Sequence, residues 1–173
     1  MKSTTLLACL MAICFAAACA RAPAKPVFNA ARAIDTIRTG EVNWNADWKS
    51  GDPGKVAAHY APQAIVMVPG QAPVSGLEAI RAMAQKSMDD PAFNLAFSSD
   101  KVDMAASGDL AASRGTFTLT ATDPATKART TTTGAFVTVY KPQPDGSWKA
   151  QWDMATPNPP AAPNPPPPAA PDK

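Results

Sequence analysis

The sequence predicts an α+β fold, with three helices and one strand leading into a run of about four antiparallel strands. Apolar residues recur at steps of three and four in the first half of the core, and at steps of two in the second half. Turn signals built from Gly, Pro and Asp separate these segments. The predicted core, residues 29–156, is long enough to bury one hydrophobic core.

The first helix is predicted from an apolar stripe that contains one glutamate. The stripe consists of Ile34, Ile37, Glu41, Trp44 and Trp48, whose spacing places them on one helical face. Gly51 suits the left-handed conformation that ends many helices. Asp52 and Pro53 then indicate a second helix, with an acidic N-cap and proline at the first position, running to about Tyr60.

A short apolar run, AIVMV at residues 64–68, predicts a strand that Pro69-Gly70 stops. Ser75 and Glu78 have the spacing of a capping box, which predicts that the third helix begins at Ser75. One side of this helix is apolar, and Pro91 ends it. The apolar residues are Ile80, Met83, Ala84 and Met88.

The remaining strands are indicated by alternation in RGTFTLTAT, GAFVTVY and SWKAQWDM. Asp123-Pro124 and Asp145-Gly146 mark turns between strands. In the last strand, strict alternation places Trp148, Ala150, Trp152 and Met154 on one face and Asp153 on the other. Asp153 is therefore expected to face solvent or a dimer partner, unless a bulge reverses the faces.

The first 18 residues are typical of a secretion signal, with Lys2 ahead of an apolar run. FAAAC resembles a bacterial lipobox, which predicts cleavage before Cys19, acylation of Cys19 and a lipidated tether over residues 19–28. Ala20 after the cysteine implies the outer membrane in a Gram-negative host. The alternative is cleavage near Ala18 or Ala20 and a soluble periplasmic or secreted protein.

All three cysteines lie within residues 1–20, so the exported domain can form no internal disulfide and no cysteine metal site. The end of the chain, residues 157–173, holds nine of the nineteen prolines. We expect a disordered proline-rich tail, because proline lacks an N–H and fixes φ. It serves either as a passive spacer or as a ligand for an aromatic groove.

The net charge is +2 and is scattered, with no basic stripe, which argues against nucleic-acid binding. A single histidine cannot supply a histidine metal triad, so neither a metal nor a cofactor is predicted.

Four segments in order carry a family resemblance: WNADWKSGD, HYAPQAIVMVPG, VSGLEAIR and PDGSWKAQWD. Over residues 34–156 the chain resembles the SnoaL-like domain of the nuclear-transport-factor-2-like superfamily, which also holds the ketosteroid isomerases. The resemblance implies a cone-shaped curved sheet wrapped on helices, a pocket at its wide end, and a homodimer formed through the outer sheet face.

The resemblance also argues against ketosteroid isomerase chemistry. The position matching the general base of those enzymes is Val68, and the position matching the oxyanion-hole tyrosine is Trp44. The second oxyanion-hole acid corresponds to Val137 or Thr138. Proton abstraction requires a base within reach of the carbon acid, and none of these residues is one.

Three residues are candidates for other chemistry. Glu41 is either a pocket acid with a perturbed pKa or a helix-face glutamate satisfied by a neighbour. His59 near the end of the second helix is favourable there through the helix dipole alone, or it acts as a base. Asp153 is the third candidate, with the polar-face interpretation described above.

The aromatic and thioether residues suit either a pocket for a flat apolar ligand or a packed core. This predicted lining comprises Trp44, Trp48, Tyr60, Met67, Phe117, Trp152 and Met154. The leading hypothesis is a lipid-anchored domain on the periplasmic side that binds a small apolar ligand. The alternatives are a cyclase, isomerase or dehydratase using Glu41 or His59, and an envelope protein-interaction module.

Overall fold

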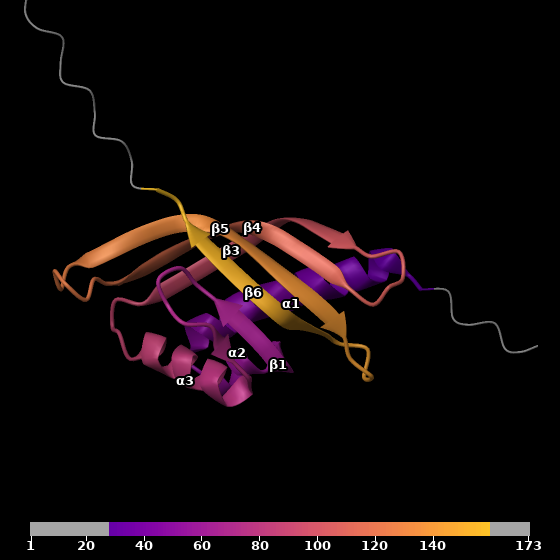
Figure 1. The fold of residues 1–173 in the computed structure, drawn as a ribbon, viewed down its shortest axis with the longest axis horizontal. Helices are drawn as coiled ribbons and strands as arrows, with labels where there is room; N and C mark the ends of the chain where they lie inside the picture. The colour runs from indigo at the N-terminus through magenta and orange to yellow at the C-terminus, as the bar shows by residue number, and fades with distance from the viewer. Residues whose placement is uncertain (1–27, 160–173) are drawn as a thin grey trace, which may run out of the picture.

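A computed structural model describes residues 28–159, in which three helices pack against one curved six-stranded sheet (Figure 1). The helices are α1 (Ala30–Ser50), α2 (Pro53–Ala57) and α3 (Leu77–Met88). The strands are β1 (Tyr60–Met67), β2 (Val74–Ser75), β3 (Asn94–Met104), β4 (Ala111–Thr122), β5 (Arg129–Pro142) and β6 (Trp148–Pro157). The predicted α+β class is confirmed.

The sheet order is β2-β1-β6-β5-β4-β3. β3 to β6 form the predicted antiparallel run, whereas β1 and β6 pair in parallel. α1 packs mainly against β3, and α3 packs against α2 and β1. The beginning of α1 and the end of β6 lie at opposite ends of the molecule (Figure 1). Among residues 28–159, no helix combines the length and apolar character needed to cross a membrane.

Ile37, Trp44 and Trp48 of the stripe predicted for α1 are buried, Ile34 is partly buried, and Glu41 is buried with them. Asn29 caps the start of the helix by accepting the N–H of Arg32. Gly51 ends it at φ 71°, in the left-handed conformation that the sequence predicted. The predicted Gly51 cap is therefore confirmed, and the helix directs its buried face towards the sheet.

The second helix is shorter than predicted, although its Asp52 N-cap is confirmed by hydrogen bonds from the N–H groups of Gly54 and Lys55. It ends at Ala57 rather than Tyr60. The reason is that Tyr60 already pairs with Ala150 in β6, so the chain has entered the sheet.

The capping box predicted at Ser75 and Glu78 is wrong. Ser75 belongs to β2 and pairs with Ile65. The helix begins at Leu77, after Gly76 at φ 83°, and no side chain caps it. Strand pairing of Ser75 takes the place of the cap. Ile80 and Ala84 are buried on the predicted apolar side.

A bulge in β6 at Gln151 reverses the faces of the last strand. Ala150 pairs with Tyr140, but Trp152 pairs with Val139, so one residue of β6 has no counterpart in β5. Ala150 is fully buried before the bulge, whereas Trp152 is 40% exposed after it. Asp153 therefore faces the helices, and the predicted inward orientation of Trp152 and Met154 is wrong.

Candidate functional site

A cavity of about 350 Å³ lies between the helices and the inner face of the sheet. We call it the inner cavity. Its walls are dominated by aromatic side chains from α1, β3, β4 and β5 and the segment before β3: Trp44, Trp48, Phe93, Phe97, Phe117 and Phe136. Tyr60, Thr138 and Asp153 contribute polar atoms. A volume of this size is within the range of small-molecule sites.

Asp153 provides the carboxylate of the inner cavity. Its Oδ2 accepts a hydrogen bond from the Tyr60 hydroxyl at 2.8 Å, and its Oδ1 accepts one from Thr138 at 2.9 Å. Burial raises the pKa of Asp153, and the nearby charge of Glu41 adds to the rise, while both hydroxyl donors oppose it. Asp153 in β6 is therefore an ionisable residue of the cavity wall that is hydrogen-bonded to both β1 and β5.

The aromatic wall is a connected series of rings. Trp44 meets Tyr60 edge-on with centroids 4.8 Å apart, and Phe97 at 5.5 Å. Phe97 in turn meets Phe136 at 5.6 Å. The Nε1–H of Trp44 is buried and has no hydrogen-bond partner among the described residues. An acceptor on a bound molecule would satisfy this donor.

Glu41 is 5% exposed and does not line the inner cavity. Its Oε1 accepts a hydrogen bond from Tyr140 at 3.0 Å, and its Oε2 accepts one from Ser99. Burial and the charge of Glu41 raise the pKa of Tyr140 well above its usual value. Of the two interpretations open at the sequence level, the structure favours a carboxylate satisfied by its neighbours.

His59 lies behind the wall of the inner cavity and does not line it. Its Nε2 is 2.7 Å from Oδ2 of Asp47, and its ring stacks on Trp44 at 5.2 Å. Burial lowers the pKa of His59 more than the Asp47 hydrogen bond raises it. His59 therefore supports the Trp44 ring from outside the cavity.

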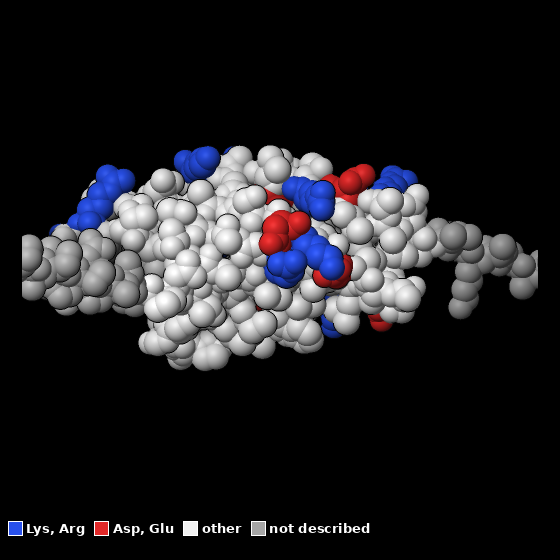
Figure 2. Space-filling model, turned by 90° about the horizontal axis from the view of Figure 1, so that it is seen from above, with Lys and Arg blue, Asp and Glu red and all other residues white. Residues whose placement is uncertain are grey.

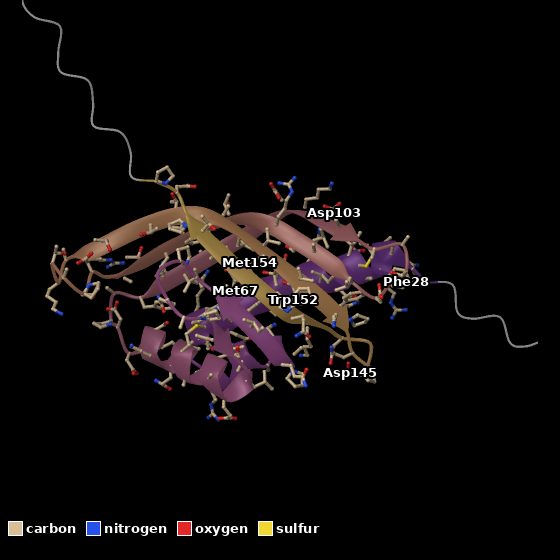
Figure 3. The ribbon with its side chains drawn as sticks, in the orientation of Figure 1. Phe28, Met67, Asp103, Asp145, Trp152 and Met154 are labelled. Atoms are coloured by element: carbon tan, nitrogen blue, oxygen red, sulfur yellow. The ribbon has the colours of Figure 1, made fainter. Side chains whose placement is uncertain are left out.

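The predicted lining is divided between two faces of the sheet. Trp44, Trp48, Tyr60 and Phe117 line the inner cavity. Met67, Trp152 and Met154 do not, and Figure 3 shows them along β1 and β6. The Gln151 bulge turns Trp152 and Met154 outward, and Met67 follows the inward-facing Val66 in the alternation of β1.

Sequence reasoning missed Phe93, Phe97 and Phe136 as lining residues. The apolar residues Leu95 and Phe97, two apart in the sequence, could have indicated the inward face of β3, because both line the inner cavity. Val68, which the sequence comparison predicted to match the isomerase base, also lines the inner cavity. Thr138 faces inward, whereas Val137 is 37% exposed.

The outer face of the sheet carries an apolar group that we call the outer patch. Trp152 pairs with Ile65, and Met154 pairs with both Met67 and Val137, so these five side chains are cross-strand neighbours. The face shown in Figure 2 is mostly uncharged, with one mixed cluster of acidic and basic side chains near its middle and further charged groups towards its edges. Within residues 28–159, no group of three or more His, Cys, Asp and Glu side chains is placed to hold a metal ion.

The sequence and the fold were compared with those of known proteins. The family model described as SnoaL-like domain matches residues 42–150. No curated protein matches the chain in sequence.

Three solved structures show the same fold. A ketosteroid isomerase-like protein from Erwinia carotovora atroseptica has a TM-score of 0.65 at 20% identity, covering 77% of this chain and 100% of its own. A nuclear-transport-factor-2-like protein with a cystatin-like fold from Novosphingobium aromaticivorans has a TM-score of 0.57 at 18% identity, covering 73% and 82%. A protein from Catenulispora acidiphila in complex with S-DNPA has a TM-score of 0.60 at 12% identity, covering 73% and 94%.

Proposed function

The chain belongs to the SnoaL-like domain family, and we propose that its inner cavity binds a small, largely apolar molecule. The observation that carries the proposal is an aromatic cavity of about 350 Å³ with one carboxylate, Asp153, in its wall. Such a site combines apolar surface for affinity with a single polar group that fixes orientation. The Catenulispora structure, solved with S-DNPA, is an example of this fold with a bound compound.

Binding without ketosteroid isomerase chemistry is the form of the proposal that fits the cavity wall. The family resemblance matches Val68 to the isomerase base, and a valine side chain cannot accept a proton. The fold alone assigns no reaction, since one fold carries many unrelated functions.

A ligand screen with two matched variants tests this proposal. Ala155 lines the inner cavity, so Ala155→Phe should fill it, whereas Ala135→Phe adds the same ring on the exposed outer face. We expect calorimetry to find small apolar compounds that bind the wild type and Ala135→Phe but not Ala155→Phe. The proposal fails if no compound from a diverse set binds, or if binding persists in a folded Ala155→Phe variant.

Proton transfer is the second candidate function. Asp153 is a better candidate for the base than Glu41 or His59. Asp153 lines the inner cavity and has a raised pKa, which suits a general base at neutral pH, while Glu41 and His59 do not line the cavity. A proton would move from a carbon of the bound molecule to the Asp153 carboxylate. Assays on ring-forming and ketosteroid substrates should then lose activity in Asp153→Asn, and equal rates would exclude this role.

The outer patch supports a further proposal, that two copies of the chain pair through this face. Trp152 and Met154 are 40% and 41% exposed. They lie two positions apart in β6, beside Ile65 and Met67 of β1. A pair should appear in light scattering, and Trp152→Asp should convert it to monomer, while Thr118→Asp on β4 should not. A monomeric wild type would leave the patch to a different envelope protein, which cross-linking with and without residues 160–173 would reveal.

Export and anchoring rest on Cys19, which lies outside the described residues, as do residues 160–173 of the predicted tail. We propose that acylated Cys19 holds the domain to the membrane through several buried lipid chains. Cys19→Ser should move the protein from the membrane fraction to the soluble fraction of the envelope. If wild type and mutant are both soluble after osmotic shock, ordinary secretion replaces the lipoprotein proposal.

A further inference from the structure

We propose that the inner cavity takes a particular class of ligand: a small aromatic or alicyclic molecule that carries one protonated amine, paired with Asp153. This inference rests on the proposed binding function and deepens it. It follows from the charge, the free lone pairs and the aromatic surroundings of the Asp153 carboxylate.

The first step is the charge balance of the inner cavity. Asp153 is its only lining residue that carries a formal charge, and no Lys, Arg or His of the described chain lines it. The nearby charged side chain that influences Asp153 is Glu41, which has the same sign. Lys141 lies 6.0 Å from the centre of the Trp152 ring, on the other face of the sheet. Residues 28–159 thus supply the Asp153 carboxylate with no counter-ion.

The second step concerns hydrogen-bonding capacity. A carboxylate has about four acceptor positions on its two oxygens. Tyr60 fills one position on Oδ2 and Thr138 fills one on Oδ1. One position remains on each oxygen, while the hydroxyl protons of Tyr60 and Thr138 are already used. A ligand that meets Asp153 must therefore donate a hydrogen bond, and a ligand carboxylate would be repelled.

The third step is the nature of the walls. Tyr60, Trp44, Phe97 and Phe136 form successive edge-on contacts and all line the inner cavity. Aromatic faces attract organic cations, and Trp and Tyr do so most strongly. A carboxylate beside such rings matches an ammonium group attached to an apolar body.

A protonated amine also answers the burial of Asp153 in a way that a neutral ligand does not. Burial penalises the ionised carboxylate and so raises the pKa of Asp153. An ammonium offsets that penalty through its charge and donates a charge-assisted hydrogen bond, which is about twice as strong as a neutral one. An alcohol of the same shape donates a bond but brings no charge.

Three compounds of matched shape test the inference by calorimetry at pH 7.5: 1-naphthylmethylamine, 1-naphthylmethanol and 1-naphthoate. We expect the amine to bind the full-length wild type about tenfold more tightly than the alcohol, as one charge-assisted bond plus a cation–π contact suggests. We expect no binding of the naphthoate. In Asp153→Asn the amine should lose about tenfold while the alcohol is unchanged, and Asp100→Asn on the surface should alter neither.

The outcomes separate this inference from the proposed function. Equal affinities of amine and alcohol, or tighter binding of the naphthoate, would overturn the amine class and leave ligand binding intact. Binding of the alcohol alone would do the same. If none of the three compounds binds and the wider screen is also empty, the proposed function fails, and the amine class fails with it.

A pH titration of the wild type provides a second test if Asp153→Asn does not fold. The ionisable groups around Asp153 are Tyr60 on β1, Tyr140 on β5 and Glu41 on α1. The pKa values of both tyrosines are raised, so both stay protonated as the pH falls from 7.5 to 4.5. Because burial raises the pKa of Asp153, Asp153 takes up its proton at a higher pH than an ordinary carboxyl does. Amine affinity should fall across this range while alcohol affinity stays constant. Parallel curves would contradict the pairing with Asp153.

Discussion

Removing the Tyr140 hydroxyl should have opposite effects on stability depending on whether Glu41 is present. In the wild type, Tyr140 donates to Glu41 at 3.0 Å, and both side chains are 5% exposed or less. A hydrogen bond to a charged group contributes about 1.5–3 kcal/mol. Tyr140→Phe should therefore lower the free energy of unfolding of the wild type by about 2 kcal/mol.

In a Glu41→Ala background the sign should reverse. Glu41→Ala leaves the hydroxyls of Tyr140 and Ser99 without their acceptor, at a cost of about 1–3 kcal/mol for each buried group. Adding Tyr140→Phe then removes one unsatisfied group, so it should be neutral or stabilising. The coupling energy between the two sites should be about 3–5 kcal/mol, the sum of the lost bond and the relieved penalty.

Urea unfolding followed by tryptophan fluorescence measures all four variants of this cycle. Trp44, one turn along α1 from Glu41 and 3% exposed, reports loss of the core. A coupling energy below about 0.5 kcal/mol, the usual scatter for independent sites, would refute the pairing of Glu41 with Tyr140. It would also reopen Glu41 as an acid available to a ligand.

Three further predictions concern titration and backbone packing. The pKa of Asp153 is raised by folding, so its contribution to stability is present below the unfolded pKa of about 3.9 and is lost as the pH rises through the folded pKa. Urea unfolding should therefore show the free energy of unfolding of the wild type decreasing relative to that of Asp153→Asn above about pH 4. The lowered pKa of His59 has the opposite consequence: below about pH 6.5 the wild type should lose melting temperature relative to His59→Gln, and superimposable pH profiles would contradict the burial argument. Gly115→Ala would place a Cβ 2.0 Å from the Ser98 carbonyl oxygen and should destabilise the protein by about 1–3 kcal/mol or more. Gly40 lies on α1 with nothing close to an added Cβ, so Gly40→Ala should stabilise the protein by about 0.5–1 kcal/mol. Urea midpoints measure both changes.

Much of the fold was predictable because local rules agreed with the global structure. The α1 stripe, the Gly51 end and the Asp52 cap each depend on a few neighbouring residues, and all three are confirmed. The start of the third helix was not predictable in this way. Ser75 has a good capping side chain, but its pairing with Ile65 places it in β2, which no local pattern reveals.

The candidate site was harder to predict because it depends on one residue outside the sheet register. Trp152 and Asp153 alternate correctly, but the Gln151 bulge decides which of them faces the cavity. Nothing in the letters SWKAQWDM marks a bulge, since no glycine or proline interrupts the strand. The bulge therefore moves Asp153 from the outer face to the inner cavity.

A crystal structure of the chain with 1-naphthylmethylamine would show whether the inner cavity holds an amine at Asp153. We expect density for the ring in the inner cavity, against Phe97 and Phe136, with the amine nitrogen within hydrogen-bond distance of an Asp153 oxygen. The compound should also raise the melting temperature of the same protein in solution. If the protein's own side chains fill the inner cavity, or if the compound binds elsewhere on the surface without contacting Asp153, then the inner cavity is not an amine site.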